Sequence, residues 1–128
     1  MVKVEFIAAA LAVLLLSASA ATAKVKLQND ADSRAKIIAW VQAEDLAKQC
    51  KRLKLNGPVV LAMPLYFALD AGQGGYSPTE IGEAKQALAS EAHQGLLAKG
   101  AVDGKSRTFC AVGNAEKRAG SMIGRMFK

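Results

Sequence analysis

The amino-acid sequence predicts an all-α protein: a compact four-helix single domain that follows a cleaved signal peptide and contains one disulfide. Three observations support this prediction. Several long segments carry apolar residues at the spacing of an α-helix. Clusters of glycine, proline and asparagine separate these segments. The chain also has two cysteines, Cys50 and Cys110, that can join. The predicted helices span about residues 31–53, 57–71, 78–99 and 115–127.

Residues 1–23 have the layout of a secretory signal peptide. Lys3 makes the N-terminus weakly positive, an apolar run occupies residues 6–16, and an A-x-A cleavage site ends at Ala23, before Lys24. The run is about half of the ~20 apolar residues that span a bilayer, which argues against an uncleaved membrane anchor. We therefore expect a periplasmic or secreted protein whose residues 24–128 form the helical domain.

Export would place the two cysteines in an oxidising compartment, where they can pair. No Cys-x-x-Cys motif is present, so a structural disulfide between Cys50 and Cys110 is favoured over a redox pair. This link would close most of the mature chain into one loop. In the chain-entropy model, such a loop removes about 4 kcal/mol of unfolded-state entropy.

The first helix has start signals and a clear apolar stripe. Asp30, Asp32 and Ser33 offer capping oxygens and negative charge at its start. We expect the segment before them, residues 24–29, to be loose. Trp40 is interpreted as a core residue rather than a ligand-binding aromatic. The predicted stripe consists of Ala39, Ala43, Leu46, Cys50 and Leu53.

The second helix is predicted from an almost uninterrupted apolar run at residues 59–69 that follows Gly57 and Pro58. A buried strand is the alternative, but the chain offers no second strand to pair with it. Pro64 predicts a bend near residues 62–64. Three residues beside this bend form a possible pocket, although a purely core role remains open for them: Met63, Tyr66 and Phe67.

The third helix has the strongest local signal in the chain. After a glycine turn at residues 72–75, Ser77 is placed to cap a helix, Pro78 occupies its first position, and Glu80 can reach back to the cap amide. Gly100 provides the C-terminal stop. The predicted apolar face consists of Ile81, Ala84, Leu88, Ala92 and Leu96.

The fourth helix is predicted at the C-terminus. Residues 108–112 are interpreted as a short extended segment or a single turn, and Asn114 as the cap of a helix over residues 115–127. Gly120 and Gly124, four residues apart, would let this helix press closely against another one.

Several short motifs resemble those of a known family. They are Gly75-Tyr76-Ser77 with Glu80-Ile81, Gly100-Ala101-Val102, and Cys110-Ala111-Val112-Gly113 with Glu116 and Gly120. The chain resembles a group of short exported alphaproteobacterial proteins, a domain of unknown function, that carry an earlier cysteine near the Cys50 position. The resemblance implies a signal peptide, a helical fold and the disulfide. It implies no activity or ligand. Pro64 and Lys117 depart from the pattern of the group.

The sequence offers little support for catalysis. His93 is the single histidine and is interpreted as a surface residue, so we expect no metal site. No Gly-x-Ser-x-Gly elbow and no phosphate-binding loop is present. Glu80 and Glu83 share a helix turn, but Glu80 is better explained as the cap partner. We therefore expect a protein that is not an enzyme and that has no cofactor.

The formal net charge of +6 bears on the choice of partner. It is compatible with weak contact with an anionic membrane or cell-wall surface, and a solvated basic face that keeps the protein soluble is the favoured alternative. Nucleic acid is disfavoured, because few aromatic residues accompany the basic ones. Our first hypothesis is a non-catalytic periplasmic interaction or accessory protein that docks on another envelope protein. The alternatives are a carrier of a small ligand or lipid, and a basic membrane-surface protein or stress chaperone.

Overall fold

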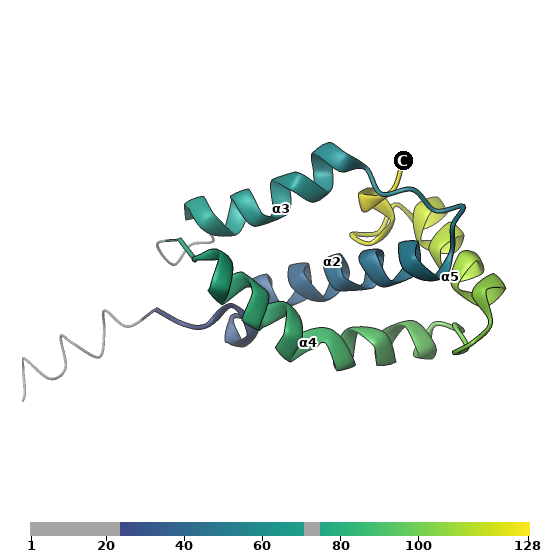
Figure 1. Ribbon diagram of the computed structural model, residues 1–128, viewed down its shortest axis with the longest axis horizontal. Coiled ribbons are helices and arrows are strands. Elements are labelled where there is room, and N and C mark those ends of the chain that lie inside the picture. Colours follow the sequence, from purple (N-terminus) through teal and green to yellow (C-terminus); the bar gives the residue numbers. More distant parts are fainter. Residues whose placement is uncertain (1–23, 71–74) are drawn as a thin grey trace, which may run out of the picture.

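Helices make up most of the described part of the chain, which is residues 24–70 and 75–128 of this computed structural model. In Figure 1, α2 and α4 run side by side in the same direction, α3 returns above them, and α5 closes one end. No β-strand occurs in these two ranges, so the predicted all-α class is confirmed. The elements are η1 (Leu27–Asn29), α2 (Ala31–Gln49), α3 (Gly57–Asp70), α4 (Pro78–Ala98), α5 (Ser106–Ala119) and η2 (Gly124–Met126), where η denotes a 3₁₀ turn.

Two predictions fall on residues that the structure does not describe. The signal peptide at residues 1–23 lies outside the described residues, and so does most of the glycine turn at residues 72–75. Among the helices that are described, none is both long enough and apolar enough to cross a membrane.

Helix α2 begins where the sequence predicts and ends earlier. The Asp30 carboxylate accepts a hydrogen bond from the Ser33 amide (3.0 Å), which caps the helix and lowers the pKa of Asp30. The last helical residue is Gln49, because Cys50 adopts an extended conformation (φ −126°, ψ 104°) at the disulfide. The predicted stripe is buried, and so is the core candidate Trp40: Ala39, Trp40, Ala43, Leu46, Cys50 and Leu53.

Helix α3 lies close to its predicted position. It spans Gly57–Asp70, against the predicted residues 57–71, and Pro64 lies within it. The helix is therefore not broken at the proline, which tells against a strand in this apolar run. The bend at residues 62–64 stays a prediction.

Helix α4 confirms the predicted capping box. The Ser77 hydroxyl accepts a hydrogen bond from the Glu80 amide (3.1 Å), and the Glu80 carboxylate accepts one from the Ser77 amide (3.1 Å). The second bond lowers the pKa of Glu80. Gly100, with a φ of 112°, follows the helix as predicted. The predicted apolar face is buried: Ile81, Ala84, Leu88, Ala92 and Leu96.

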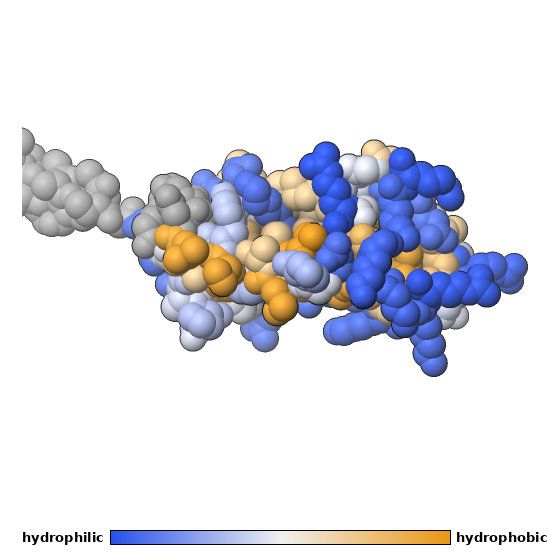
Figure 2. All heavy atoms as spheres, turned by 90° about the horizontal axis from the view of Figure 1, so that it is seen from above, coloured by the Kyte–Doolittle hydropathy of each residue, from blue (hydrophilic) through white to orange (hydrophobic). Residues whose placement is uncertain are grey.

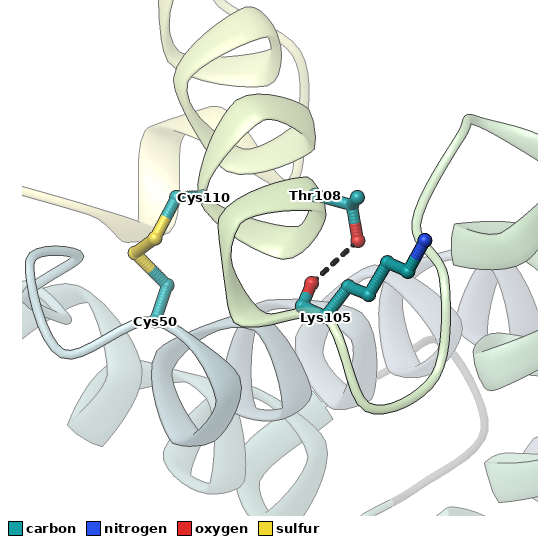
Figure 3. Close-up of a disulfide and its surroundings, with 4 residues drawn as sticks. All are labelled: Cys50, Lys105, Thr108 and Cys110. Carbon is teal, nitrogen blue, oxygen red and sulfur yellow. Dashed lines mark hydrogen bonds between the residues drawn. A yellow bond between two sulfur atoms is a disulfide. The ribbon is translucent and has the colours of Figure 1, made fainter.

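The position of the last helix is predicted wrongly, because α5 spans Ser106–Ala119 rather than residues 115–127. Thr108 explains the earlier start. Its hydroxyl donates a hydrogen bond to the Lys105 carbonyl (2.7 Å; Figure 3) and accepts one from the Val102 amide (2.8 Å). These bonds close the turn ahead of the helix, so that the chain enters α5 about two turns before the predicted cap.

The predicted details of this region are corrected in the same way. Residues 108–112, expected to be extended, and Asn114, expected to be a cap, both lie inside α5. The helix ends at Gly120, whose φ of 63° favours glycine. Gly124 lies beyond it in η2, where a Cβ would overlap the Glu116 carbonyl. The two glycines therefore do not share a helix face; one ends α5 and the other lets the C-terminal tail lie against it.

The start of the domain is folded, although the sequence predicts a loose segment there. Leu27 is buried in the core. The Tyr76 hydroxyl donates a hydrogen bond to the Val25 carbonyl (2.6 Å), and the Lys24 ammonium donates one to the Gly75 carbonyl (2.7 Å). These bonds tie the beginning of the domain to the residues that precede α4, which a local reading of the sequence does not reveal.

The core lies between α2, α4, α5 and the C-terminal tail. The tail is fixed to the α2–α3 loop, because the Asn56 amide donates to the Met126 carbonyl (2.8 Å) and the Lys128 amide to the Lys54 carbonyl (2.9 Å). Phe67 is the one buried side chain among those described in α3. The largest fully buried apolar side chains are Leu27, Ile37, Leu46, Phe67, Leu88, Leu96 and Phe109.

Candidate functional site

Helix α3 exposes most of its apolar side chains. Leu61, Leu65 and Leu69, four residues apart, are 72%, 55% and 74% exposed. Residues at this spacing lie on one side of a helix, and we call these three the leucine face. Figure 2, viewed from the side of α3, shows apolar side chains gathered over this part of the molecule. A contiguous exposed apolar patch is typical of an interaction surface.

One open groove runs along α3 on the side of α2. Its volume is about 450 Å³, and its lining is apolar apart from Lys36. The Lys36 ammonium binds Asp32 (2.5 Å) and lies 5.1 Å from the centre of the Tyr66 ring. The Asp32 carboxylate and the Tyr66 hydroxyl raise the pKa of Lys36. The groove is lined by Lys36, Pro58, Val59, Ala62, Met63 and Tyr66.

This groove contains two of the three residues of the predicted pocket. Met63 and Tyr66 line it, whereas Phe67 points into the core and is fully buried. The rings of Tyr66 and Phe67 meet edge to face, with centroids 5.1 Å apart. Phe67 therefore contacts Tyr66 from the core side and does not line the groove.

A second open groove lies between α3 and α4, next to the leucine face. Its volume is about 440 Å³, and Lys85 is the single charged residue that lines it. The Lys85 ammonium binds Glu44 (2.6 Å) and lies 4.0 Å from the centre of the Trp40 ring, so its position is fixed from two sides. The lining residues are Pro64, Leu65, Ala68, Pro78, Ile81, Gly82 and Lys85.

His93, expected at the surface, is half-buried and bridges two aspartates. Its Nδ1 lies 2.8 Å from a carboxylate oxygen of Asp45 in α2, and its Nε2 lies 2.8 Å from one of Asp103 in the α4–α5 turn. Both contacts are hydrogen bonds only when both ring nitrogens carry protons. The Asp45 carboxylate first, and then Asp103, raise the pKa of His93. The residue is thus a clamp between three segments, and its protonated form is the one that hydrogen-bonds to both carboxylates.

The two cysteines form the predicted disulfide. Figure 3 shows Cys50, at the end of α2, bonded to Cys110 in the second turn of α5. The Cα atoms are 5.2 Å apart, which is within the usual range for a disulfide. Cys50 is buried and Cys110 is half-buried. The disulfide therefore fixes α5 against the end of α2 and does not present a reactive thiol.

Two carboxylates of α4 have structural contacts. Glu80 caps α4 and also binds the Lys24 ammonium (3.3 Å), and Glu91 pairs with Arg34. Within the described ranges, no group of three or more His, Cys, Asp and Glu side chains is arranged to hold a metal ion. The feature that stands out among the described residues is the exposed apolar face of α3 with its two grooves.

Sequence reasoning missed the leucine face and the His93 clamp. The run at residues 59–69 is apolar on all sides, so its pattern does not say which side is exposed. The partners of His93 lie 48 and 10 residues away in the chain, and nothing next to it in the sequence marks them. Only the leucine spacing itself could have suggested a continuous apolar face.

Comparison with known proteins yields one match. A family model described as a family of unknown function (DUF5333) matches residues 25–128. No curated protein and no solved structure shows a significant match. The matched region includes all the helices described above.

Proposed function

The chain belongs to DUF5333, a family of unknown function, and we propose that this member is a non-catalytic interaction protein. It is exported to the periplasm and docks on another protein of the cell envelope through the leucine face of α3. The apolar leader and the disulfide support an oxidising location outside the cytoplasm. The residues that carry the docking proposal are Leu61, Leu65 and Leu69.

The exposure of these leucines is the single observation on which the proposal depends. Burying one exposed leucine side chain contributes about 1.5–3 kcal/mol, so three on one face offer a large driving force for association. The two grooves beside them, each over 400 Å³, are hollows into which side chains of a partner fit. Interfaces commonly place apolar anchors in such hollows.

The charged groups that line the two grooves are the ammonium groups of Lys36 and Lys85. Each already pairs with a carboxylate of the same chain, Lys36 with Asp32 and Lys85 with Glu44. The partner that best complements this surface is therefore one that offers apolar anchors to the leucine face and its two grooves.

Photo-crosslinking in the producing cells tests this proposal. A photoreactive phenylalanine analogue would replace Leu65 on the leucine face, or Gln94, which is exposed on α4, as the matched control. We expect one envelope protein to be crosslinked from position 65 and not from position 94. Replacing the neighbouring leucine, Leu61→Glu, should abolish the product, because a carboxylate would be buried in an apolar interface.

Three outcomes would count against docking on another protein. A product of twice the protein's own mass would identify a second copy as the occupant. Equal products from positions 65 and 94 would show that the leucine face is not selective. A product with a lipid or small molecule alone would favour the carrier alternative, for which the groove lined by Met63 and Tyr66 has a suitable volume.

A further inference from the structure

Lysine and arginine are concentrated at the end of the molecule that the disulfide closes. Residues 48–54 and 99–128, which we call the basic end, contain eleven of the seventeen Lys and Arg residues but two of the eleven Asp and Glu residues. This end therefore carries a formal net charge of +9 and the rest of the chain −3, which together give +6. In Figure 2, hydrophilic side chains accumulate toward the end of the molecule away from the apolar side chains of α3.

The fold brings separate segments together to make this end. The disulfide joins residue 50 to residue 110, and the Lys128 amide donates to the Lys54 carbonyl (2.9 Å). The close approach of Gly124 to Lys117 places the tail against the last turns of α5. Six exposed cations thus stand on neighbouring segments: Lys51, Arg52, Lys54, Lys117, Arg118 and Lys128.

The charge of these six cations is not neutralised within the described part of the protein. The two acidic residues of the basic end are engaged elsewhere, Asp103 with His93 and Glu116 with Lys99 (2.6 Å). The Lys99 ammonium lowers the pKa of Glu116. No ion pair joins any of the six to a carboxylate that the structure describes. They are free to bind an external anion.

The form of this surface favours a bilayer over other polyanions. Phe109 and Phe127, the aromatic residues of the basic end, are buried, so no ring is exposed there on which the bases of a nucleic acid could stack. None of the six cations lines either groove beside α3. The hollow of about 640 Å³ at the start of α5 is lined by Lys105 and Arg107 and by none of the six, so the six cations form an open surface and not a pocket for an acidic peptide. A bilayer presents a continuous layer of phosphate groups, so the six cations can bind it without a fixed alignment between cation and phosphate.

We propose that the basic end binds the anionic lipid surface of an envelope membrane as a peripheral, electrostatic contact. This inference rests on the six unpaired cations and not on the leucine face. Bound in this way, the protein would present α3 close to the proteins of that membrane. The contact is reversible, because it is screened by salt and involves no membrane-spanning segment among the described residues.

Vesicle flotation tests the proposal with the purified protein. We expect binding to vesicles of equal parts phosphatidylglycerol and phosphatidylcholine, and none to phosphatidylcholine alone. The bound fraction should fall at least about tenfold as salt rises from roughly 50 to 300 mM. The double variant Lys51→Gln/Arg52→Gln should weaken binding on the order of tenfold, since each cation near an anionic surface contributes to the affinity.

A matched control separates the basic end from net charge alone. The double variant Lys26→Gln/Gln86→Glu also lowers the net charge by two, at exposed positions outside the basic end, and should bind almost as the unmodified protein does. A variant with Leu61, Leu65 and Leu69 replaced by serine should retain the salt-sensitive binding. This result does not depend on whether α3 has a docking partner, so it tests the basic end separately from the leucine face.

Four results would overturn the proposal. They are absence of binding to the anionic vesicles at low salt, binding that salt does not weaken, and equal losses in the two charge variants. The fourth is tighter binding to soluble poly-L-glutamate than to vesicles of the same anion concentration, which would assign the basic end to an acidic polypeptide.

Discussion

His93 holds together three segments of the chain. Its two ring nitrogens contact Asp45 in α2 and Asp103 in the α4–α5 turn, each at 2.8 Å. Its ring also stacks near Phe109 of α5, with centroids 6.3 Å apart. Because protonated His93 satisfies both carboxylates, the pKa of His93 is raised in the folded state. Folding is therefore coupled to protonation at this residue.

The first prediction concerns the pH dependence of stability. A raised folded pKa means that the contribution of His93 is fully present below the unfolded pKa of about 6.5 and is lost as pH rises through the folded pKa. At pH 5.5, His93→Gln should lower the free energy of unfolding by about 1–2 kcal/mol, since charged hydrogen bonds are lost. Thermal unfolding between pH 5 and pH 9 measures this difference.

The control for this prediction is Asp103→Asn. It removes the more exposed of the two partners (65% against 23% side-chain exposure for Asp45). At low pH it should therefore lower the free energy of unfolding by less than His93→Gln does. The His93→Gln variant should approach the unmodified protein in stability at high pH. An equal gap at pH 5 and pH 9 would contradict a protonated clamp.

At the scale of the elements, glycines decide how closely the C-terminal segments pack. A Cβ at Gly124 would overlap the backbone carbonyl of Glu116 at the end of α5. Met126 and Phe127, which follow it, are buried in the core. The tail thus completes the hydrophobic core only because a residue without a side chain lets it lie against α5.

The second prediction follows from this packing. Gly124→Ala should lower the free energy of unfolding by about 1–3 kcal/mol, because the overlap is with backbone that cannot rotate away. Gly82→Ala is the matched control: Gly82 lies within α4, and a Cβ there meets nothing within 4 Å. This control should raise stability by roughly 0.5–1 kcal/mol, the usual gain of alanine over glycine in a helix. Urea unfolding of both variants would measure these changes. Unaltered stability in Gly124→Ala would mean that the tail does not lie against α5.

At the scale of the whole molecule, one covalent bond and an uneven charge distribution organise the protein. The disulfide joins residues 60 positions apart and holds α5 and the tail at one end. The same end gathers most of the positive charge, while the most exposed large apolar side chains, those of Leu61, Leu65 and Leu69, lie on α3. The molecule therefore has two distinct surfaces. For the leucine face of α3 we propose a protein partner, and for the basic end we propose a bilayer.

The third prediction concerns the disulfide. The double variant Cys50→Ala/Cys110→Ala should lose about 4 kcal/mol of unfolding free energy, because the unfolded chain regains the entropy of an open loop of this length. This corresponds to a fall in Tm on the order of 20 °C for a domain of this size. Helix content at low temperature should not change, and calorimetry with circular dichroism would measure both quantities. A reductant should lower the Tm of the unmodified protein alone; equal melting of the two proteins would show that the link does not stabilise the fold.

The sequence by itself determined the helical class, the caps of α2 and α4, the buried faces of both helices and the disulfide pair. These features depend on chemistry that a few neighbouring residues express, such as the Ser77 and Glu80 capping box, or on the presence of just two cysteines. Such signals are readable without knowledge of the rest of the fold. The same is true of the net positive charge, although not of its position in space.

Only the tertiary structure decided where α5 runs, which side of α3 is exposed, and that His93 is a clamp. Thr108 closes a turn with Val102, and this contact overrode the capping signal at Asn114. The leucine face is exposed because α2 and α4 pack against each other and, of the described side chains of α3, fully bury Phe67 alone. The exposed side of α3 and the His93–Asp45 contact depend on residues that are distant in the chain, and the local pattern does not encode them. The Thr108–Val102 bond spans only six residues, but two local signals compete there and the sequence pattern alone does not show which one prevails.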